Sequence, residues 1–297
     1  MLVSIWKFTR PHAFIGTLAA IIGLYVIVLA QSEQDTFAPG MLLQTLAACL
    51  AAAVFIVGYN QYHDLEIDRI NKPELPYAAG ELTRTQVLTI LGLCLATALL
   101  LALLAGGWLL ATVASSLLIG AAYSAPFTRL KKSSLWAAAC ILAVRGPIIN
   151  VGLYLHFSTT LTGSDDVPGS IWLLVILTLL FALVIAWSKD IPDTQGDARF
   201  GVETLVMRLG PDFLFRIGRW ILTAAFAFVM LAGAGPWLPE LDGRVLAATQ
   251  GLLLAALWLR SRGVNPHDND AIKPYYLFIW NLFQLEYLAF PLATLAV

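Results

Sequence analysis

The chain has 297 residues, of which 59% are hydrophobic and 12% are charged, and its formal net charge at pH 7 is −1. A composition this apolar excludes an ordinary soluble globular protein, and the near-zero charge gives no basis for a nucleic-acid partner. We therefore expect an all-α protein that crosses the lipid bilayer several times.

Nine apolar stretches are long enough to cross about 30 Å of hydrocarbon as helices. In chain order they cover residues 12–30, 41–63, 86–105, 108–125, 135–156, 171–189, 214–234, 245–260 and 275–296. Gly106 and Gly107 divide the third stretch from the fourth. Joining these two stretches would remove one crossing and invert every later one. No polar linker interrupts the series, so we expect one transmembrane domain over residues 1–297.

The basic residues lie almost entirely on one side of this predicted topology. All of the 18 Lys and Arg residues except Arg145 and Arg244 fall in the N-terminal segment or in alternate loops. The positive-inside rule assigns that side to the cytoplasm. The first span begins near residue 12, which leaves no room for a transit peptide. We therefore predict a bacterial inner-membrane protein whose N-terminus is cytoplasmic.

Polar residues recur with helical spacing at the cytoplasmic end of the second span. Asn60, Asp64 and Asp68 are four residues apart, so on a helix they cover an arc of roughly 80° and share one face. Lys72 continues the same spacing. It is a candidate contact for an anionic ligand, or a simple ion-pair partner of the carboxylates.

A second acidic cluster follows the sixth span. It contains Asp190, Asp193 and Asp197, and Lys189 precedes it. Four crossings separate the two clusters, so both emerge on the same side of the membrane and can meet. Facing carboxylates repel one another unless cations lie between them. Mg²⁺ together with a phosphate-bearing ligand suits such oxygen donors, and the alternative is a set of solvated helix ends.

The fourth span ends in the sequence YSAPFTRLKK. Arg129 and Lys131 in this segment are candidates to stabilise charge on a departing pyrophosphate. The alternative is an ordinary basic flank of a membrane span. We give this alternative the same weight as a functional role for Lys132, and somewhat less weight for Arg129 and Lys131. Tyr123 is either part of the site or an interfacial aromatic residue.

The fifth span contains an arginine, Arg145. An arginine inside the membrane needs an anionic partner, which is either the carboxylate or diphosphate of a substrate or an acidic side chain such as Glu286. Asn150 follows Arg145 on the same span, and we expect it to line the same cavity.

These motifs resemble the UbiA superfamily of intramembrane prenyltransferases, and the resemblance covers nearly the whole chain. Five segments resemble its homogentisate prenyltransferase branch, which serves tocopherol and plastoquinone synthesis: WKFTRPHAFIGT, NQYHDLEIDRINKPELPYAAGE, VRGPIINVGLYLHF, KDIPDTQGDARFG and FIWNLFQLEYLAFP. Gln61 stands where many superfamily members have Asp. The Tyr-x-x-x-Lys element of some relatives is absent, because Phe127 stands four residues after Tyr123, and Arg129 or Lys131 would replace it.

The resemblance implies about nine transmembrane helices around a central cavity that opens to the cytoplasmic side, with Mg²⁺ as cofactor. It implies transfer of a prenyl group from an isoprenoid diphosphate to an aromatic acceptor, homogentisate, with loss of CO₂. The implied catalytic residues are Asp64, Asp68, Asp193, Asp197 and Arg145, of which the four Asp residues would bind the metal. The implied substrate-binding residues are Asn60, Lys72, Tyr123, Arg129, Lys131, Asn150, Lys189 and Asp190.

Two alternatives stay open at this point. The acceptor could instead be 4-hydroxybenzoate, a flavonoid or a quinolone. From another class, an ion-coupled secondary transporter could also use acids and an arginine in its spans, although such acids lie near the middle of the membrane. Nothing in the sequence points to a protein partner.

Overall fold

The computed structural model describes residues 2–32, 37–199 and 204–297, without the side chains of residues 12, 13 and 193–199. Within these ranges every regular element is a helix, as predicted. The elements are α1 (Leu2–Phe8), α2 (Pro11–Gln31), α3 (Pro39–His63), α4 (Leu65–Asn71), α5 (Arg84–Ala105), α6 (Gly107–Ser124), the 3₁₀ turn η1 (Leu130–Lys132), α7 (Ser134–Ala143), the π turn η2 (Val144–Ile148), α8 (Ile149–Leu161), α9 (Gly169–Arg199), α10 (Leu205–Leu209), α11 (Pro211–Gly233), α12 (Gly243–Ser261) and α13 (Asn269–Leu295).

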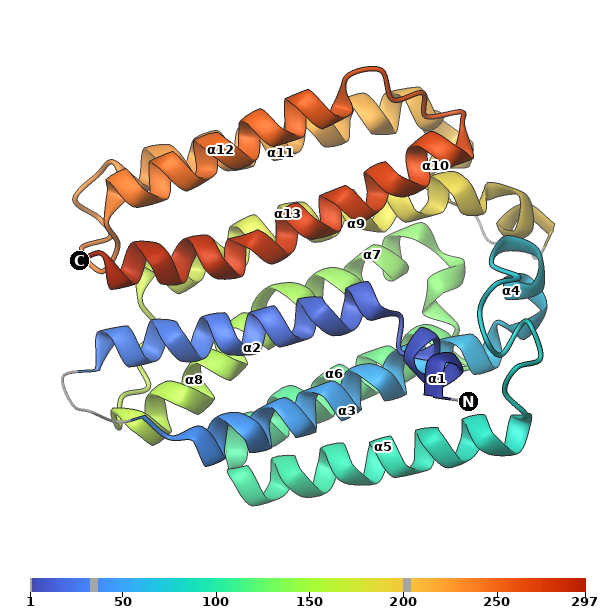
Figure 1. Ribbon diagram of the computed structural model, residues 1–297, viewed down its shortest axis with the longest axis horizontal. Coiled ribbons are helices and arrows are strands. Elements are labelled where there is room, and N and C mark those ends of the chain that lie inside the picture. Colours follow the sequence, from blue (N-terminus) through green and yellow to red (C-terminus); the bar gives the residue numbers. More distant parts are fainter. Residues whose placement is uncertain (1, 33–36, 200–203) are drawn as a thin grey trace.

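The long helices run side by side as one bundle (Figure 1). Helix α3 packs against α2, α5 and α6, and α13 packs against α2, α9 and α12. The short helices α1, α4 and α10 lie together at one end of the bundle, and the C-terminus lies at the other (Figure 1). The two termini are therefore at opposite ends, as an odd number of crossings requires.

Seven segments of the described chain are long and apolar enough to cross a membrane. They correspond to the first seven predicted spans. Helices α12 and α13 match the last two predicted spans and have 19 and 27 residues, but their greater polar content leaves them outside this set. The count of nine crossings therefore stays a prediction.

The third and fourth predicted spans are separate helices. Helix α5 ends at Ala105 and α6 begins at Gly107, and the two helices pack against each other. Gly106 between them has φ = 121°, a conformation that favours glycine because a side chain would clash there. The alternative of one merged span is therefore wrong.

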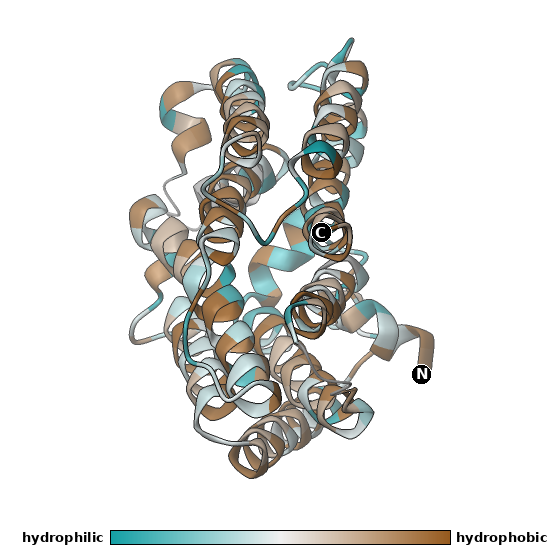
Figure 2. Cartoon of the chain, turned by 90° about the vertical axis from the view of Figure 1, so that its left-hand side faces the viewer, coloured by the Kyte–Doolittle hydropathy of each residue, from teal (hydrophilic) through white to brown (hydrophobic). Residues whose placement is uncertain are grey.

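The surface of the bundle is apolar, and several polar side chains are inside it. Large side chains such as Leu104, Leu118 and Leu231 are more than two-thirds exposed, whereas Asn150 and Glu286 are completely buried. In the end-on view, hydrophilic residues occur within the bundle as well as in the loops (Figure 2). This distribution suits a protein whose surrounding solvent is lipid.

The N-terminal segment is fastened to α3 beside the polar end of the bundle. Phe8 is completely buried, and its ring packs so close to Gly58 that a Cβ there would lie 2.6 Å from it. The Gln61 side-chain amide donates a hydrogen bond of 2.8 Å to the Phe8 carbonyl. Gln61 is therefore an anchor for the N-terminal segment, and this contact brings Arg10 to the end of α3.

Candidate active site

Two adjoining cavities lie between the helices at the polar end of the bundle. The larger has a volume of about 270 Å³ and extends among α2, α3, α6, α9 and α13. The smaller has a volume of about 100 Å³ and lies where α3, α4 and α9 meet. Both cavities are lined by Arg10, Asn60, Tyr123, Ile141, Ala186 and Lys189. The smaller cavity, which we call the charged chamber, therefore adjoins the larger, mostly apolar cavity.

The first acidic motif lines the smaller cavity as its spacing predicts. Asn60 is in the last turn of α3, Asp64 joins α3 to α4, and Asp68 is on α4. Helical hydrogen bonding continues through the junction, because Asp64 N donates to Asn60 O at 3.0 Å and Asp68 N donates to Asp64 O at 2.7 Å. The four-residue spacing therefore keeps all three side chains on the cavity side.

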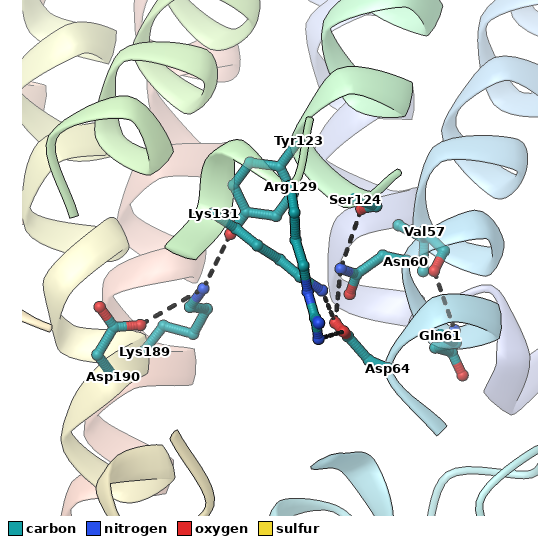
Figure 3. Close-up of polar contacts among 10 residues, drawn as sticks. All are labelled: Val57, Asn60, Gln61, Asp64, Tyr123, Ser124, Arg129, Lys131, Lys189 and Asp190. Carbon is teal, nitrogen blue, oxygen red and sulfur yellow. Dashed lines mark hydrogen bonds and ion pairs between the residues drawn. The ribbon is translucent and has the colours of Figure 1, made fainter. Parts of the chain in front are cut away.

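Asp64 is held by three side chains, one from the last turn of α3 and two from the segment after α6 (Figure 3). Asn60 Nδ2 donates to Asp64 Oδ2 at 2.9 Å and also to Ser124 Oγ at 3.1 Å. Lys131 Nζ forms an ion pair with Asp64, and Arg129 Nη2 lies 3.7 Å from Asp64 Oδ1. Arg129 has φ = 36°, an uncommon left-handed conformation for a side-chain-bearing residue.

Burial changes the acid–base behaviour of this chamber. It raises the pKa of Asp68 to about 6, and the nearby Lys72 opposes part of this rise. It also lowers the pKa of Lys131, and the adjacent Asp64 carboxylate opposes that shift. Lys72 lines the smaller cavity together with both carboxylates, so all the predicted groups of the first motif meet there.

The second acidic motif reaches the same cavity from α9. Lys189 Nζ donates to Tyr123 Oη at 3.3 Å and lies 3.4 Å from Asp190 Oδ1, and both Lys189 and Asp190 line the smaller cavity (Figure 3). Helix α4 also packs against α9. The described parts of the two motifs therefore converge, as predicted.

The remaining residues of the second motif, Asp193 and Asp197, are on α9, which continues to Arg199 through Pro192. Their side chains lie outside the described residues, so their metal-binding role stays a prediction.

The described residues suit a hard cation such as Mg²⁺, although they do not complete a site. Among the side chains that the structure describes, no three acidic, His or Cys groups are close enough to hold a metal. Asp64 and Asp68 nevertheless offer carboxylate oxygens to one cavity, and Asp64 Oδ1 is buried without a hydrogen bond. A buried carboxylate oxygen of this kind is a suitable Mg²⁺ ligand.

Arg145 lines the larger cavity from the π turn η2. Its guanidinium carbon lies 4.2 Å from the centre of the Trp280 ring and 5.8 Å from that of Phe283. No ion pair to Arg145 occurs among the described side chains. Glu286 instead accepts a hydrogen bond of 2.7 Å from Gln250 Nε2, so it is not the partner that the sequence suggested for Arg145.

Asn150 does not line either cavity in the described structure, contrary to our expectation. Its side chain is completely buried, and Nδ2 donates to the carbonyl oxygens of Arg145 at 2.9 Å and Gly146 at 2.8 Å. In the described structure its partners are therefore protein groups, and its amide contacts the backbone that carries Arg145.

One residue of the site was missed by the sequence analysis. Arg10 lines both cavities and has φ = 53°, immediately before Pro11 begins α2. It lies in WKFTRPHAFIGT, one of the five segments that carry the family resemblance, but that segment alone does not single out Arg10 as a site residue. Its place directly before a proline at the start of the first span was a second clue, because proline restricts the backbone of the residue before it.

The chain is similar to known proteins over nearly its whole length. The UbiA prenyltransferase family matches residues 17–282. The chain is 41% identical to homogentisate phytyltransferase of Synechocystis over 98% of this chain and 95% of that protein. It is 34% identical to homogentisate geranylgeranyltransferase of Hordeum vulgare over 97% of this chain and 72% of that protein. The structure of a UbiA homolog from Archaeoglobus fulgidus bound to GPP and Mg²⁺ matches with a TM-score of 0.67 at 16% identity, covering 99% of this chain and 100% of that one.

Proposed function

Because this chain belongs to the UbiA prenyltransferase family, we propose that it transfers a prenyl group from an isoprenoid diphosphate to homogentisate. The observation that carries this proposal is the joining of a charged chamber to an apolar cavity that Arg145 lines. The relatives named above differ in the prenyl donor and share the acceptor, which supports homogentisate and leaves the donor chain length open.

We infer that the charged chamber binds the diphosphate. Asp64 and Asp68, together with Asp193 and Asp197, would hold Mg²⁺, which when bound neutralises diphosphate charge and favours release of pyrophosphate. The basic side chains supply further positive charge from α9, from the loop after α6 and from the segment before α2, and these are Lys189, Arg129, Lys131 and Arg10. Asn60 orients Asp64 through its hydrogen bond.

The apolar cavity suits the chemistry that comes after ionisation. When the allylic C–O bond breaks, its electron pair leaves with the diphosphate and an allylic cation remains. Ile56, Leu153 and Ile185 line the cavity with hydrocarbon, which excludes water that would otherwise capture this cation. A ring carbon of the acceptor then supplies the electron pair of the new C–C bond. The ring carbon loses its proton. The bond between the acceptor's side-chain carbon and its carboxylate breaks with release of CO₂, and that side-chain carbon takes up a proton with the electron pair that remains.

The acceptor carboxylate fits Arg145. This guanidinium lines the apolar cavity, and the described structure contains no acidic side chain paired with it. A cation in such a place attracts a small organic anion strongly, because the surrounding dielectric constant is low. Trp280 beside it offers an aromatic surface for the acceptor ring. This combination favours an aromatic acid over a neutral acceptor.

The protein is an integral membrane protein, and the part of the chain that the structure describes has seven segments long and apolar enough to cross a membrane. We further propose that the charged chamber faces the cytoplasm of a bacterial cell and opens from the inner membrane. Helix α1 belongs to the N-terminal segment, and α4 and α10 belong to loops predicted to be basic and cytoplasmic. All three helices lie at one end of the bundle (Figure 1), which supports this orientation. Residues 1–297 would act as one transmembrane prenyltransferase domain.

The proposed function can be tested with purified protein in detergent. The protein is incubated with Mg²⁺, homogentisate and a panel of prenyl diphosphates, and products are identified by mass. We expect a decarboxylated prenylated quinol with at least one donor. If prenylated products form from 4-hydroxybenzoate, a flavonoid or a quinolone but not from homogentisate, the proposed acceptor is wrong and the compound that reacts takes its place. Ion-dependent uptake into vesicles without any prenylated product would instead indicate a transporter.

A further inference from the structure

The backbone around Arg145 departs from regular α-helix. Residues Val144–Ile148 form one π turn between α7 and α8, and Pro147 lies inside it. Proline lacks a backbone N–H and clashes with the preceding turn, so a regular α-helix is strained there. A π turn relieves this strain by adding one residue to the turn, and such turns recur at functional sites. The direction of the Arg145 side chain therefore depends on how this turn is held.

Asn150 satisfies two carbonyl groups of the turn. Its Nδ2 donates to the oxygens of Arg145 and Gly146 at 2.9 and 2.8 Å, and it contacts Thr178 Oγ1 at 3.1 Å. Carbonyl oxygens only accept hydrogen bonds, so the nitrogen of the amide must face them. The amide oxygen must then face the opposite direction, towards α13.

Tyr287 completes this arrangement from α13. Its buried hydroxyl donates to Asn150 Oδ1 at 3.0 Å. Trp280, Phe283 and Tyr287 are spaced by three and four residues, so they share one face of α13. Tyr287 contacts the π turn through Asn150, and Trp280 lies under the Arg145 guanidinium at 4.2 Å. Helix α13 therefore holds both the backbone and the side chain of Arg145.

We propose that Asn150 and Tyr287 are positioning residues that hold the π turn so that Arg145 points into the larger cavity towards the carboxylate of the acceptor. Neither residue lines either of the two cavities described above, so they would act through Arg145. This inference rests on the proposed function, because it requires an acidic acceptor. The inference adds two residues that affect binding of the acceptor and do not affect binding of the prenyl donor.

A purely structural role makes a different prediction. A buried hydrogen bond between α8 and α13 that only stabilises the bundle would change thermal stability and affect both substrates alike. A bond that positions Arg145 would weaken use of the acceptor selectively. The ratio of the two KM values therefore separates the two roles.

The test uses Tyr287→Phe, which removes the hydroxyl and keeps the ring. Tyr154→Phe is the matched control, since the Tyr154 hydroxyl also comes from a buried tyrosine and donates to Gln31 Oε1 at 2.9 Å, away from Arg145. We expect Tyr287→Phe to raise the KM for homogentisate about fivefold or more and to reduce the thermal stabilisation by homogentisate, because misplacing a binding group weakens binding. The KM for the prenyl diphosphate should not change in either variant.

A second comparison tests whether the effect passes through Arg145. In an Arg145→Ala background, Tyr287→Phe should add no further rise in the KM for homogentisate, because the group that it positions is gone. A full additional rise in that background would overturn the inference.

The possible outcomes also separate this inference from the proposed function. If the wild-type chain uses homogentisate and Tyr287→Phe behaves like Tyr154→Phe, the positioning role is wrong and the proposed function stands. If the wild-type chain prenylates a different aromatic acid and Tyr287→Phe selectively weakens use of that acid, the acceptor is wrong and the positioning role stands.

Discussion

Lys131 offers the sharpest test of the charged chamber. Its ammonium group forms an ion pair with Asp64, and its side chain is only 9% exposed. The next residue, Lys132, is exposed to solvent, and the sequence alone favours Lys131 over it only slightly. If the chamber binds the diphosphate, Lys131→Met should reduce turnover strongly, whereas Lys132→Met should not.

The size of the effect follows from the charge that Lys131 supplies. Two unit charges about 4 Å apart interact with about 4 kcal/mol at an effective dielectric constant of about 20. Removing one group that stabilises developing negative charge typically costs about 2.7–4 kcal/mol, or about 10²–10³ in kcat. Both estimates agree, so we expect Lys131→Met to lower kcat about 100- to 1000-fold.

The assay measures kcat with both substrates saturating and Mg²⁺ in excess, and thermal unfolding in detergent checks that the variant is folded. Lys131→Arg keeps the charge and should recover part of the activity. The reasoning would be refuted if Lys131→Met kept kcat within about threefold of the wild type. It would also be refuted if Lys132→Met lost as much activity as Lys131→Met, because the predicted loss of kcat depends on the charge at Lys131 alone.

Three further predictions test the same site. Asp64→Ala should abolish turnover while the protein stays folded, because it removes a predicted metal ligand; Asp212→Ala, which removes an exposed carboxylate paired with His267, should keep activity, and an active Asp64→Ala enzyme would contradict the metal assignment. Arg145→Ala should raise the KM for homogentisate about 10-fold or more and leave the KM for the prenyl diphosphate nearly unchanged, because the guanidinium is proposed to bind only the acceptor carboxylate; an unchanged acceptor KM would exclude that contact. Since burial raises the pKa of Asp68 to about 6 and only its carboxylate form binds a cation, Mg²⁺ affinity should fall as the pH decreases through about 6; Mg²⁺ titrations of activity between pH 5 and 8 check this, and a pH-independent affinity would remove Asp68 from the site.

Several features of the fold follow from sequence patterns that are local. The lengths of the apolar stretches predict where the helices lie, because each backbone group inside a membrane must be bonded within its own helix. The four-residue spacing of Asn60, Asp64 and Asp68 predicts their shared face, since helical bonding continues across the junction between α3 and α4. The parity of the crossings predicts that the two acidic motifs emerge at the same end, and their described residues do line one cavity.

The acceptor side of the site shows where this kind of prediction ends. Asn150 follows Arg145 by five residues, which is about 140° around a regular helix, and the π turn at Val144–Ile148 changes the number of residues in the turn between them. Spacing along the sequence therefore does not decide whether the two side chains face the same cavity. Glu286 likewise has a suitable chemical character for pairing with Arg145, yet the packing of α12 against α13 brings Gln250 to it instead.

The membrane class, the helix positions, the two acidic motifs and the family resemblance can all be read from the chain alone, because each depends on composition or on spacing along a single helix. Tertiary packing was needed to bring Lys131 and Arg129 to Asp64, to place Arg10 at both cavities and to set Trp280 under Arg145. These contacts join residues far apart in the chain. They depend on which faces of packed helices meet, and helix packing is set by the shapes of many side chains together and not by any one motif.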